Sequence, residues 1–121
     1  MGQALIIEVR HEQSCAIVSA AGEIDISTVT GLRERLFELA ASGCPLVVDL
    51  DQVSFIDSAG LAALVGTAKR AAARGGNLYA ACDRPRIREL FRLTGLDCRI
   101  PLTRTLAEAI EALTAARPTP G

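Results

Sequence analysis

The chain has 121 residues and half of them are hydrophobic, which suits one domain with a full core and excludes wholesale disorder. Thirteen Lys and Arg residues against fourteen Asp and Glu residues leave a formal net charge of −1. Nucleic-acid-binding proteins normally show a strong basic excess, so we expect no nucleic-acid partner.

The sequence carries no signal for a membrane or for a bound metal. No stretch approaches the roughly 18 apolar residues of a membrane span, and no charged start precedes a short apolar core as in a signal peptide. His11 is the only histidine, and the cysteines lack the close spacing of zinc ligands. We therefore expect a cytoplasmic protein without metal, cofactor or membrane contact. Its thiols should be reduced and mostly buried in or beside strands: Cys15, Cys44, Cys82 and Cys98.

The first third of the chain predicts two strands and a helix. Apolar residues at 4–9 and 15–20 indicate paired strands joined by a polar turn at residues 10–13, and a second turn is expected at residues 22–25. A helix should begin at Ser27 and stop at Gly43, which suits the left-handed position after a last turn. Its apolar residues recur at steps of three and four: Val29, Leu32, Leu36 and Leu39.

The rest of the chain alternates strands and helices. Strands are expected at residues 46–50, 78–82 and 98–102, and helices near residues 61–74, 85–93 and from 106 onward. Such alternation implies crossover connections and helices packed on a sheet. We predict one α/β domain over residues 1–116, with a mixed, mostly parallel sheet of about five strands packed by about four helices. Residues 117–121 should form a frayed tail.

Ser58 lies where the strand at residues 46–50 gives way to the second predicted helix. A serine at a helix start can cap the helix by accepting a backbone hydrogen bond, which contributes about 1 kcal/mol. It can also be modified, because a cap is exposed at the end of an element. A phosphate would add about −1.5 to −2 charge beside Asp57. The spacing alone favours a cap without a switch.

Enzymatic roles for these residues have little support. A nucleophile elbow needs glycine two residues before the serine, where this chain has Ile56. His11 is the only candidate base and lies far away in the sequence. The carboxylates of Asp49, Asp51 and Asp57 invite a metal interpretation, but solvated turn residues explain them better. A phosphate-binding glycine loop is absent as well. From these observations together we expect no catalytic residue.

Several segments together resemble the STAS family, specifically its anti-sigma factor antagonists. They are the turn at 22–25, the strand Val48-Asp49-Leu50, the segment from Phe55 to Leu61, Gly75-Gly76, Leu90-Phe91 and Thr94-Gly95-Leu96. The resemblance runs from about residue 5 to residue 115, and Asp57-Ser58-Ala59-Gly60 is its specific part. It shifts the balance from a cap alone to a phosphorylation switch.

The resemblance implies a binding module rather than a catalyst. The unphosphorylated antagonist would bind an anti-sigma factor serine kinase and so release a sigma factor. That kinase would phosphorylate Ser58, and a phosphatase would restore the hydroxyl. The implied partner-binding surface comprises Asp25, Asp57, Ser58, Ala59 and Gly60. Many relatives have Ser or Thr where this chain has Ala59, which leaves the identity of the partner open.

Alternatives remain at this point. STAS domains also serve as soluble subunits of lipid-transport ABC complexes, and the resemblance permits weak nucleotide binding. Arg84, Arg88 and Arg92 step by four, so they should line one solvated helix face or meet an acidic partner. Gly66 is interpreted as a site of close helix-on-sheet packing. Thr28 and Thr30 are interpreted as helix-start residues.

Overall fold

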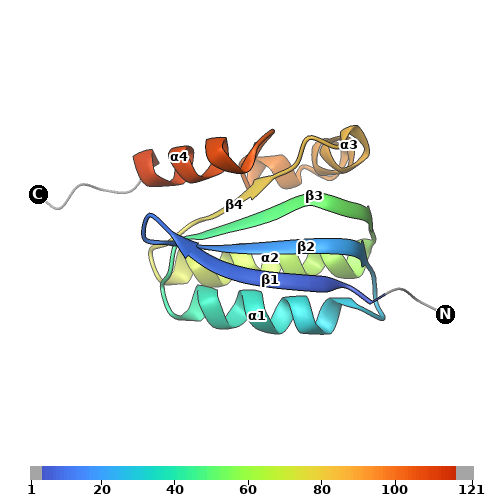
Figure 1. The fold of residues 1–121 in the computed structure, drawn as a ribbon, viewed down its shortest axis with the longest axis horizontal. Coiled ribbons are helices and arrows are strands. Elements are labelled where there is room, and N and C mark those ends of the chain that lie inside the picture. The colour runs from blue at the N-terminus through green and yellow to red at the C-terminus, as the bar shows by residue number, and fades with distance from the viewer. Residues whose placement is uncertain (1–3, 117–121) are drawn as a thin grey trace, which may run out of the picture.

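The computed structural model describes residues 4–116, which form five strands and four α-helices in an alternating order (Figure 1). The predicted tail at 117–121 lies outside the described residues. The elements are β1 (Ile6–Glu12), β2 (Cys15–Ile24), α1 (Val29–Ala41), β3 (Leu46–Ile56), α2 (Ser58–Ala73), β4 (Leu78–Ala81), α3 (Pro85–Thr94), the short 3-10 helix η1 (Leu96–Cys98), β5 (Leu102–Thr103) and α4 (Leu106–Ala116).

The five strands form one mixed sheet in the order β1-β2-β3-β4-β5. β1 pairs antiparallel with β2, whereas β3, β4 and β5 continue the sheet in parallel. Each parallel pair is connected through a helix, as crossover connections require. The predicted fold class, a mostly parallel sheet of about five strands with about four helices, is confirmed.

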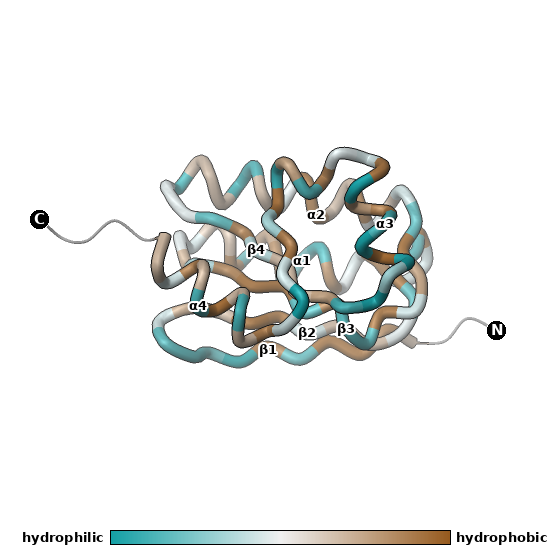
Figure 2. The backbone as a smooth tube through the Cα atoms, turned by 90° about the horizontal axis from the view of Figure 1, so that it is seen from above, coloured by the Kyte–Doolittle hydropathy of each residue, from teal (hydrophilic) through white to brown (hydrophobic). Residues whose placement is uncertain are grey.

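The sheet separates two hydrophobic clusters, because successive side chains of a strand point to opposite faces. Val18 and Val48 face the larger cluster, which α1 and α2 cover together with Ile87 and Phe91 of α3. Ile17 and Val47 face a smaller cluster, which α4 covers. Figure 1 shows α1 and α2 on one side of the sheet and α4 on the other. In Figure 2 hydrophilic and hydrophobic residues alternate along the helices, as expected for helices with one buried side.

The first two strands are longer than predicted. β1 and β2 pair as far as Glu12 opposite Cys15, so residues 10–12 belong to the strand and not to the expected turn. The hairpin turns at Gln13 and Ser14, whose φ angles of 49° and 68° match the twist of the strands that they join. The turn expected at residues 22–25 is also wrong in part, because Gly22 to Ile24 continue β2 through an irregular register.

The predictions for two later segments also need correction. β3 runs to Ile56 and not to residue 50, and polar Gln52 and Ser54 are exposed within it. The strand expected at residues 98–102 is mostly absent: Leu96–Cys98 forms η1, and β5 contains two residues. Polar residues can continue β3 because they lie on a solvated face, which the apolar pattern did not signal.

Gly66 is explained by helix-on-helix packing, so the helix-on-sheet interpretation is wrong. A Cβ atom at Gly66 of α2 would lie 3.0 Å from Cζ of Phe37 on α1. Arg70 lies over the same ring, with its guanidinium carbon 3.6 Å from the ring centroid. The absent side chain therefore makes room for an aromatic ring between the two helices.

The cysteines follow the expectation in two of four positions. Cys15 and Cys82 are buried, Cys44 is half-buried and Cys98 is exposed. Cys98 ends η1 and does not lie in the strand that was predicted there. Burial raises the pKa of the Cys82 thiol above its ordinary value. Within residues 4–116 no helix has the length and apolar character needed to cross a bilayer.

Candidate functional site

Ser58 is the first residue of α2, directly after the carboxyl end of β3. Its side chain is exposed, and its hydroxyl makes no hydrogen bond within the described part of the chain. A hydroxyl in this position is open to solvent and is not needed to complete the helix. It is therefore accessible to a second protein.

Asp57 caps α2, so the interpretation of Ser58 as the helix cap is wrong. Asp57 Oδ1 accepts hydrogen bonds from the backbone N–H groups of Ala59 at 2.9 Å and Gly60 at 3.3 Å. The backbone N–H of Asp57 still donates to the carbonyl of Ile24 at 3.1 Å, which keeps residue 57 extended beside β2. Helical geometry therefore begins one residue later, and the carboxylate takes the capping position.

The same carboxylate also contacts the β2–α1 loop. Asp57 Oδ2 accepts a hydrogen bond from the backbone N–H of Ile26 at 3.3 Å. This contact joins two loops that are 31 residues apart in the sequence. The two segments that the sequence analysis assigned to one surface, around Asp25 and around Ser58, are thus neighbours in the fold.

Asp25 organises the start of α1. Its Oδ1 accepts hydrogen bonds from the Ser27 hydroxyl at 2.6 Å, the Ser27 N–H at 2.9 Å and the Thr28 N–H at 3.1 Å. These bonds, the one from the Ser27 hydroxyl first, lower the pKa of Asp25 below its ordinary value, so the carboxylate is ionised at neutral pH. Thr28 occupies the N-cap position of α1 and Thr30 lies in its first turn, as expected.

Gly60 lies beneath this surface and is buried. A Cβ atom there would lie 2.6 Å from Cγ1 of Ile56 and 2.7 Å from Cγ2 of Ile24, which is closer than side chains approach. Glycine therefore allows α2 to start against the last residues of β2 and β3. Ala59, the residue between the serine and this glycine, is half-buried.

Two large apolar side chains that lie next to these two loops in the chain are exposed. Ile26 follows Asp25 and is 77% exposed, and Phe55 precedes Asp57 by two residues and is 43% exposed. Apolar side chains in such positions are typical of protein-binding surfaces when they gather near polar groups. Sequence analysis missed both residues, because the apolar pattern does not distinguish them from core positions.

The structure separates Ser58 from His11, the histidine considered as its base. His11 pairs with Ala16 near the start of β2, whereas Ser58 follows Ile56 at the opposite end of the sheet. Asp49 and Asp51 lie within β3 and not in a turn as interpreted. Among residues 4–116, no three His, Cys, Asp or Glu side chains lie close enough together to hold a metal ion.

The three arginines spaced by four do not form the simple solvated face expected. Arg84 donates from Nε to the carbonyl of Asp51 at 2.7 Å, and Arg88 donates from Nη1 to the carbonyl of Cys82 at 2.9 Å. Arg92 forms an ion pair with Glu89 one turn earlier in α3. Arg84 and Arg88 therefore fasten α3 to the middle of β3 and to the carboxyl end of β4.

Comparison with known proteins places this geometry in a family. The family model of the STAS domain matches residues 7–109. An anti-sigma-B factor antagonist of Bacillus subtilis (strain 168) is 39% identical over 90 residues, which cover 74% of this chain and 83% of that protein. One of Staphylococcus aureus (strain NCTC 8325 / PS 47) is 37% identical over 93 residues, covering 76% and 86%.

A solved structure agrees with these relatives. The crystal structure of an anti-sigma factor antagonist from Mycobacterium paratuberculosis superimposes with a TM-score of 0.85 at 31% identity, covering 94% of this chain and 99% of that one. The chain therefore belongs to the STAS domain family, and within it the chain is similar to the anti-sigma factor antagonists.

Proposed function

We propose that this protein is an anti-sigma factor antagonist whose binding to an anti-sigma factor serine kinase is switched by phosphorylation of Ser58. The unphosphorylated protein sequesters the kinase in the cytoplasm and so releases a sigma factor. Phosphorylation ends the binding, and a phosphatase restores it. The observation that carries this proposal is the exposed Ser58 hydroxyl, which has no bonding partner within residues 4–116 while Asp57 caps the helix.

Charge gives the switch its physical basis. A phosphate on Ser58 adds about −1.5 to −2 charge next to Asp57 and close to the loop of Asp25. The N–H groups of Ala59 and Gly60 could stabilise such an anion, but Asp57 Oδ1 already occupies both. The added charge therefore remains largely uncompensated at the surface and must be desolvated when a partner binds.

The exposed apolar side chains add to this effect. A partner that covers Ser58 together with Ile26 and Phe55 gains from the burial of the two apolar surfaces. A phosphate within such a contact loses its hydration and meets like charges from Asp25 and Asp57. This arrangement supports the proposal that the unmodified form binds the kinase and that the modified form is released.

The test begins with the serine kinase that co-purifies with the protein from its own cells. With ATP, the purified kinase should add one phosphate, located at Ser58 by mass spectrometry. Ser58→Ala should bind the kinase without being modified, and Ser58→Asp should bind at least tenfold more weakly. Ser42→Asp is the matched control, because Ser42 is an exposed serine at the far end of α1 and should leave binding unchanged.

Equal affinity of the phosphorylated and unmodified forms for the kinase would contradict the switch. A phosphate located elsewhere would contradict the assignment of Ser58. Co-purification with a transporter ATPase in place of a soluble kinase would favour the role of a lipid-transport subunit.

A further inference from the structure

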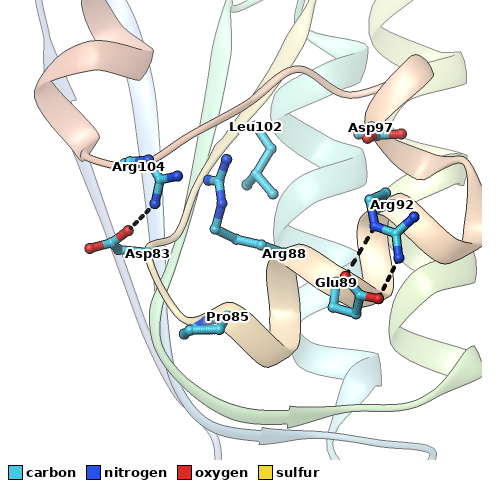
Figure 3. A pocket seen from close by; sticks show the side chains of 8 residues that line it. All are labelled: Asp83, Pro85, Arg88, Glu89, Arg92, Asp97, Leu102 and Arg104. Atoms are coloured by element: carbon cyan, nitrogen blue, oxygen red, sulfur yellow. Dashed lines mark hydrogen bonds and ion pairs between the residues drawn. The ribbon is translucent and has the colours of Figure 1, made fainter.

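A second polar site lies at the carboxyl ends of β4 and β5, apart from the Ser58 surface. A cavity of about 390 Å³ opens there between α3 and the β5–α4 connection (Figure 3). This volume lies within the range of about 300–1,000 Å³ that small-molecule sites occupy. Leu102 and Pro85 contribute apolar surface, and the remaining lining residues are charged.

The topology of the sheet favours a ligand at this position. After β4 the chain enters α3, whose Ile87 and Phe91 join the cluster of α1 and α2. After β5 it enters α4, whose Ile110 and Leu113 join the cluster on the opposite face. In open α/β sheets, a crevice forms where adjacent connections diverge to opposite faces, and ligands bind there outside the carboxyl ends of the strands.

The two guanidinium groups of Arg88 and Arg104 lie at one end of the cavity. Arg88 reaches the cavity from α3 and Arg104 from the β5–α4 connection, as Figure 3 shows. Arg104 pairs with Asp83 at 3.0 Å, whereas Arg88 forms no ion pair with any of the residues described. Arg88 is half-buried and is held by its bond to the Cys82 carbonyl. Two cations with one carboxylate leave an excess positive charge at this end.

The other end of the cavity is acidic. Glu89 and Asp97 lie there with Arg92, as Figure 3 shows, and both guanidinium bonds of Arg92 go to Glu89. The pKa of Glu89 is lowered by these bonds from Arg92, so its carboxylate is ionised at neutral pH. Asp97 makes no hydrogen bond through its side chain within the described chain and remains open to a donor.

We propose that this cavity binds the phosphate group of a small molecule through Arg88 and Arg104, with Asp97 receiving a hydroxyl or amino group of the same ligand. Guanidinium groups suit this role because they present several N–H donors in one plane to phosphate oxygens. This site is separate from the proposed switch at Ser58, and its test does not depend on the kinase.

The experiment is a titration of the ¹⁵N-labelled chain with inorganic phosphate and, in parallel, with phosphoethanolamine, at constant ionic strength. Both should produce saturable chemical-shift changes at the backbone amides of Arg88 and Arg104. Arg88→Gln should weaken binding of both probes about tenfold or more, since a charged hydrogen-bond partner is lost. Arg86→Gln is the matched control on the same helix, because Arg86 is exposed and does not line this cavity.

Arg88→Gln loses the bond to the Cys82 carbonyl, and this loss could unfold the chain. In that case Arg104→Gln tests the proposal, because the Arg104 side chain is 66% exposed and its replacement should leave the fold intact. Shifts that do not saturate, or affinities that both arginine variants leave unchanged, would overturn the proposal. Phosphoethanolamine should bind more tightly than inorganic phosphate, and Asp97→Asn should abolish that difference. Equal binding of the two probes to the unaltered chain would overturn the role assigned to Asp97.

Discussion

Replacement of Gly60 by alanine tests whether this glycine serves packing beneath the switch surface. The added methyl group would lie 2.6 Å from Cγ1 of Ile56, 2.7 Å from Cγ2 of Ile24 and 3.1 Å from Cδ1 of Ile56. Both isoleucines are buried in the core, so neither can rotate away freely. Overpacking of this kind costs about 1–3 kcal/mol.

The gain in helix propensity offsets part of this loss. Alanine is favoured over glycine inside a helix by up to about 1 kcal/mol, and less in the first turn. We therefore expect Gly60→Ala to lower the free energy of unfolding by about 1–2 kcal/mol. Near the midpoint this corresponds to a decrease in Tm of about 4 °C for each kcal/mol.

Urea denaturation followed by circular dichroism measures this difference, and Gly66→Ala provides the comparison. The methyl group at Gly66 would meet the edge of the Phe37 ring at 3.0 Å, and that ring can shift because it is only half-buried. Gly66→Ala should therefore stay within about 0.5 kcal/mol of the unaltered chain. Equal stabilities of the two alanine variants would refute the explanation from the Ile24–Ile56 contact.

Three further results are expected. Asp57→Ala should lower the free energy of unfolding by about 1 kcal/mol, because the cap of α2 is lost. Ser58→Ala should change the free energy of unfolding by less than about 0.5 kcal/mol. If urea denaturation gave the larger loss for Ser58→Ala, Ser58 would be the cap. The lowered pKa of Asp25 means that its contribution to stability is present above the ordinary carboxyl pKa of about 3.9 and is lost as the pH falls through the lower folded value. Asp25→Asn should therefore flatten the pH dependence of Tm below about pH 4, and an unchanged slope would contradict the assigned bonds. Ellman's reagent should label exposed Cys98 quickly. It should label Cys82 slowly, because Cys82 is buried and its burial raises the pKa of the thiol. The Cys98→Ser variant should therefore lose the rapid phase of labelling.

Periodicity was sufficient to predict the layers of the fold. The apolar run at 46–50 and the helical spacing of Leu32 and Leu36 correctly placed a buried strand and an amphipathic helix. The same rule failed for residues 51–56, where polar residues continue β3 on a face that α4 leaves open to solvent. Whether β3 is covered on both faces depends on the position of α4, which begins about 50 residues later in the chain. The local apolar pattern of β3 carries no information about that helix.

The sequence assigned Asp25 and Ser58 to one surface, and their loops are neighbours in the fold, but the contacts that hold these loops were not predicted. Asp57 and Ser58 are both good capping residues, and local sequence cannot decide between them. The decision comes from the bond between the Asp57 N–H and the Ile24 carbonyl, a contact between strands that are distant in sequence. The cavity of Arg88 and Arg104 was missed for a similar reason, because it depends on the faces to which α3 and α4 turn.

The two outer strands of the sheet restrict how other proteins can attach to this one. β1 presents Glu8, Arg10 and Glu12 on its exposed side, and β5 at the opposite edge is two residues long. Charged or very short outer strands disfavour the addition of a strand from another molecule. Extension of the sheet is therefore disfavoured at both borders, which protects the protein from edge-to-edge aggregation. Recognition is left to loops and helix ends, where a single side chain can decide the outcome.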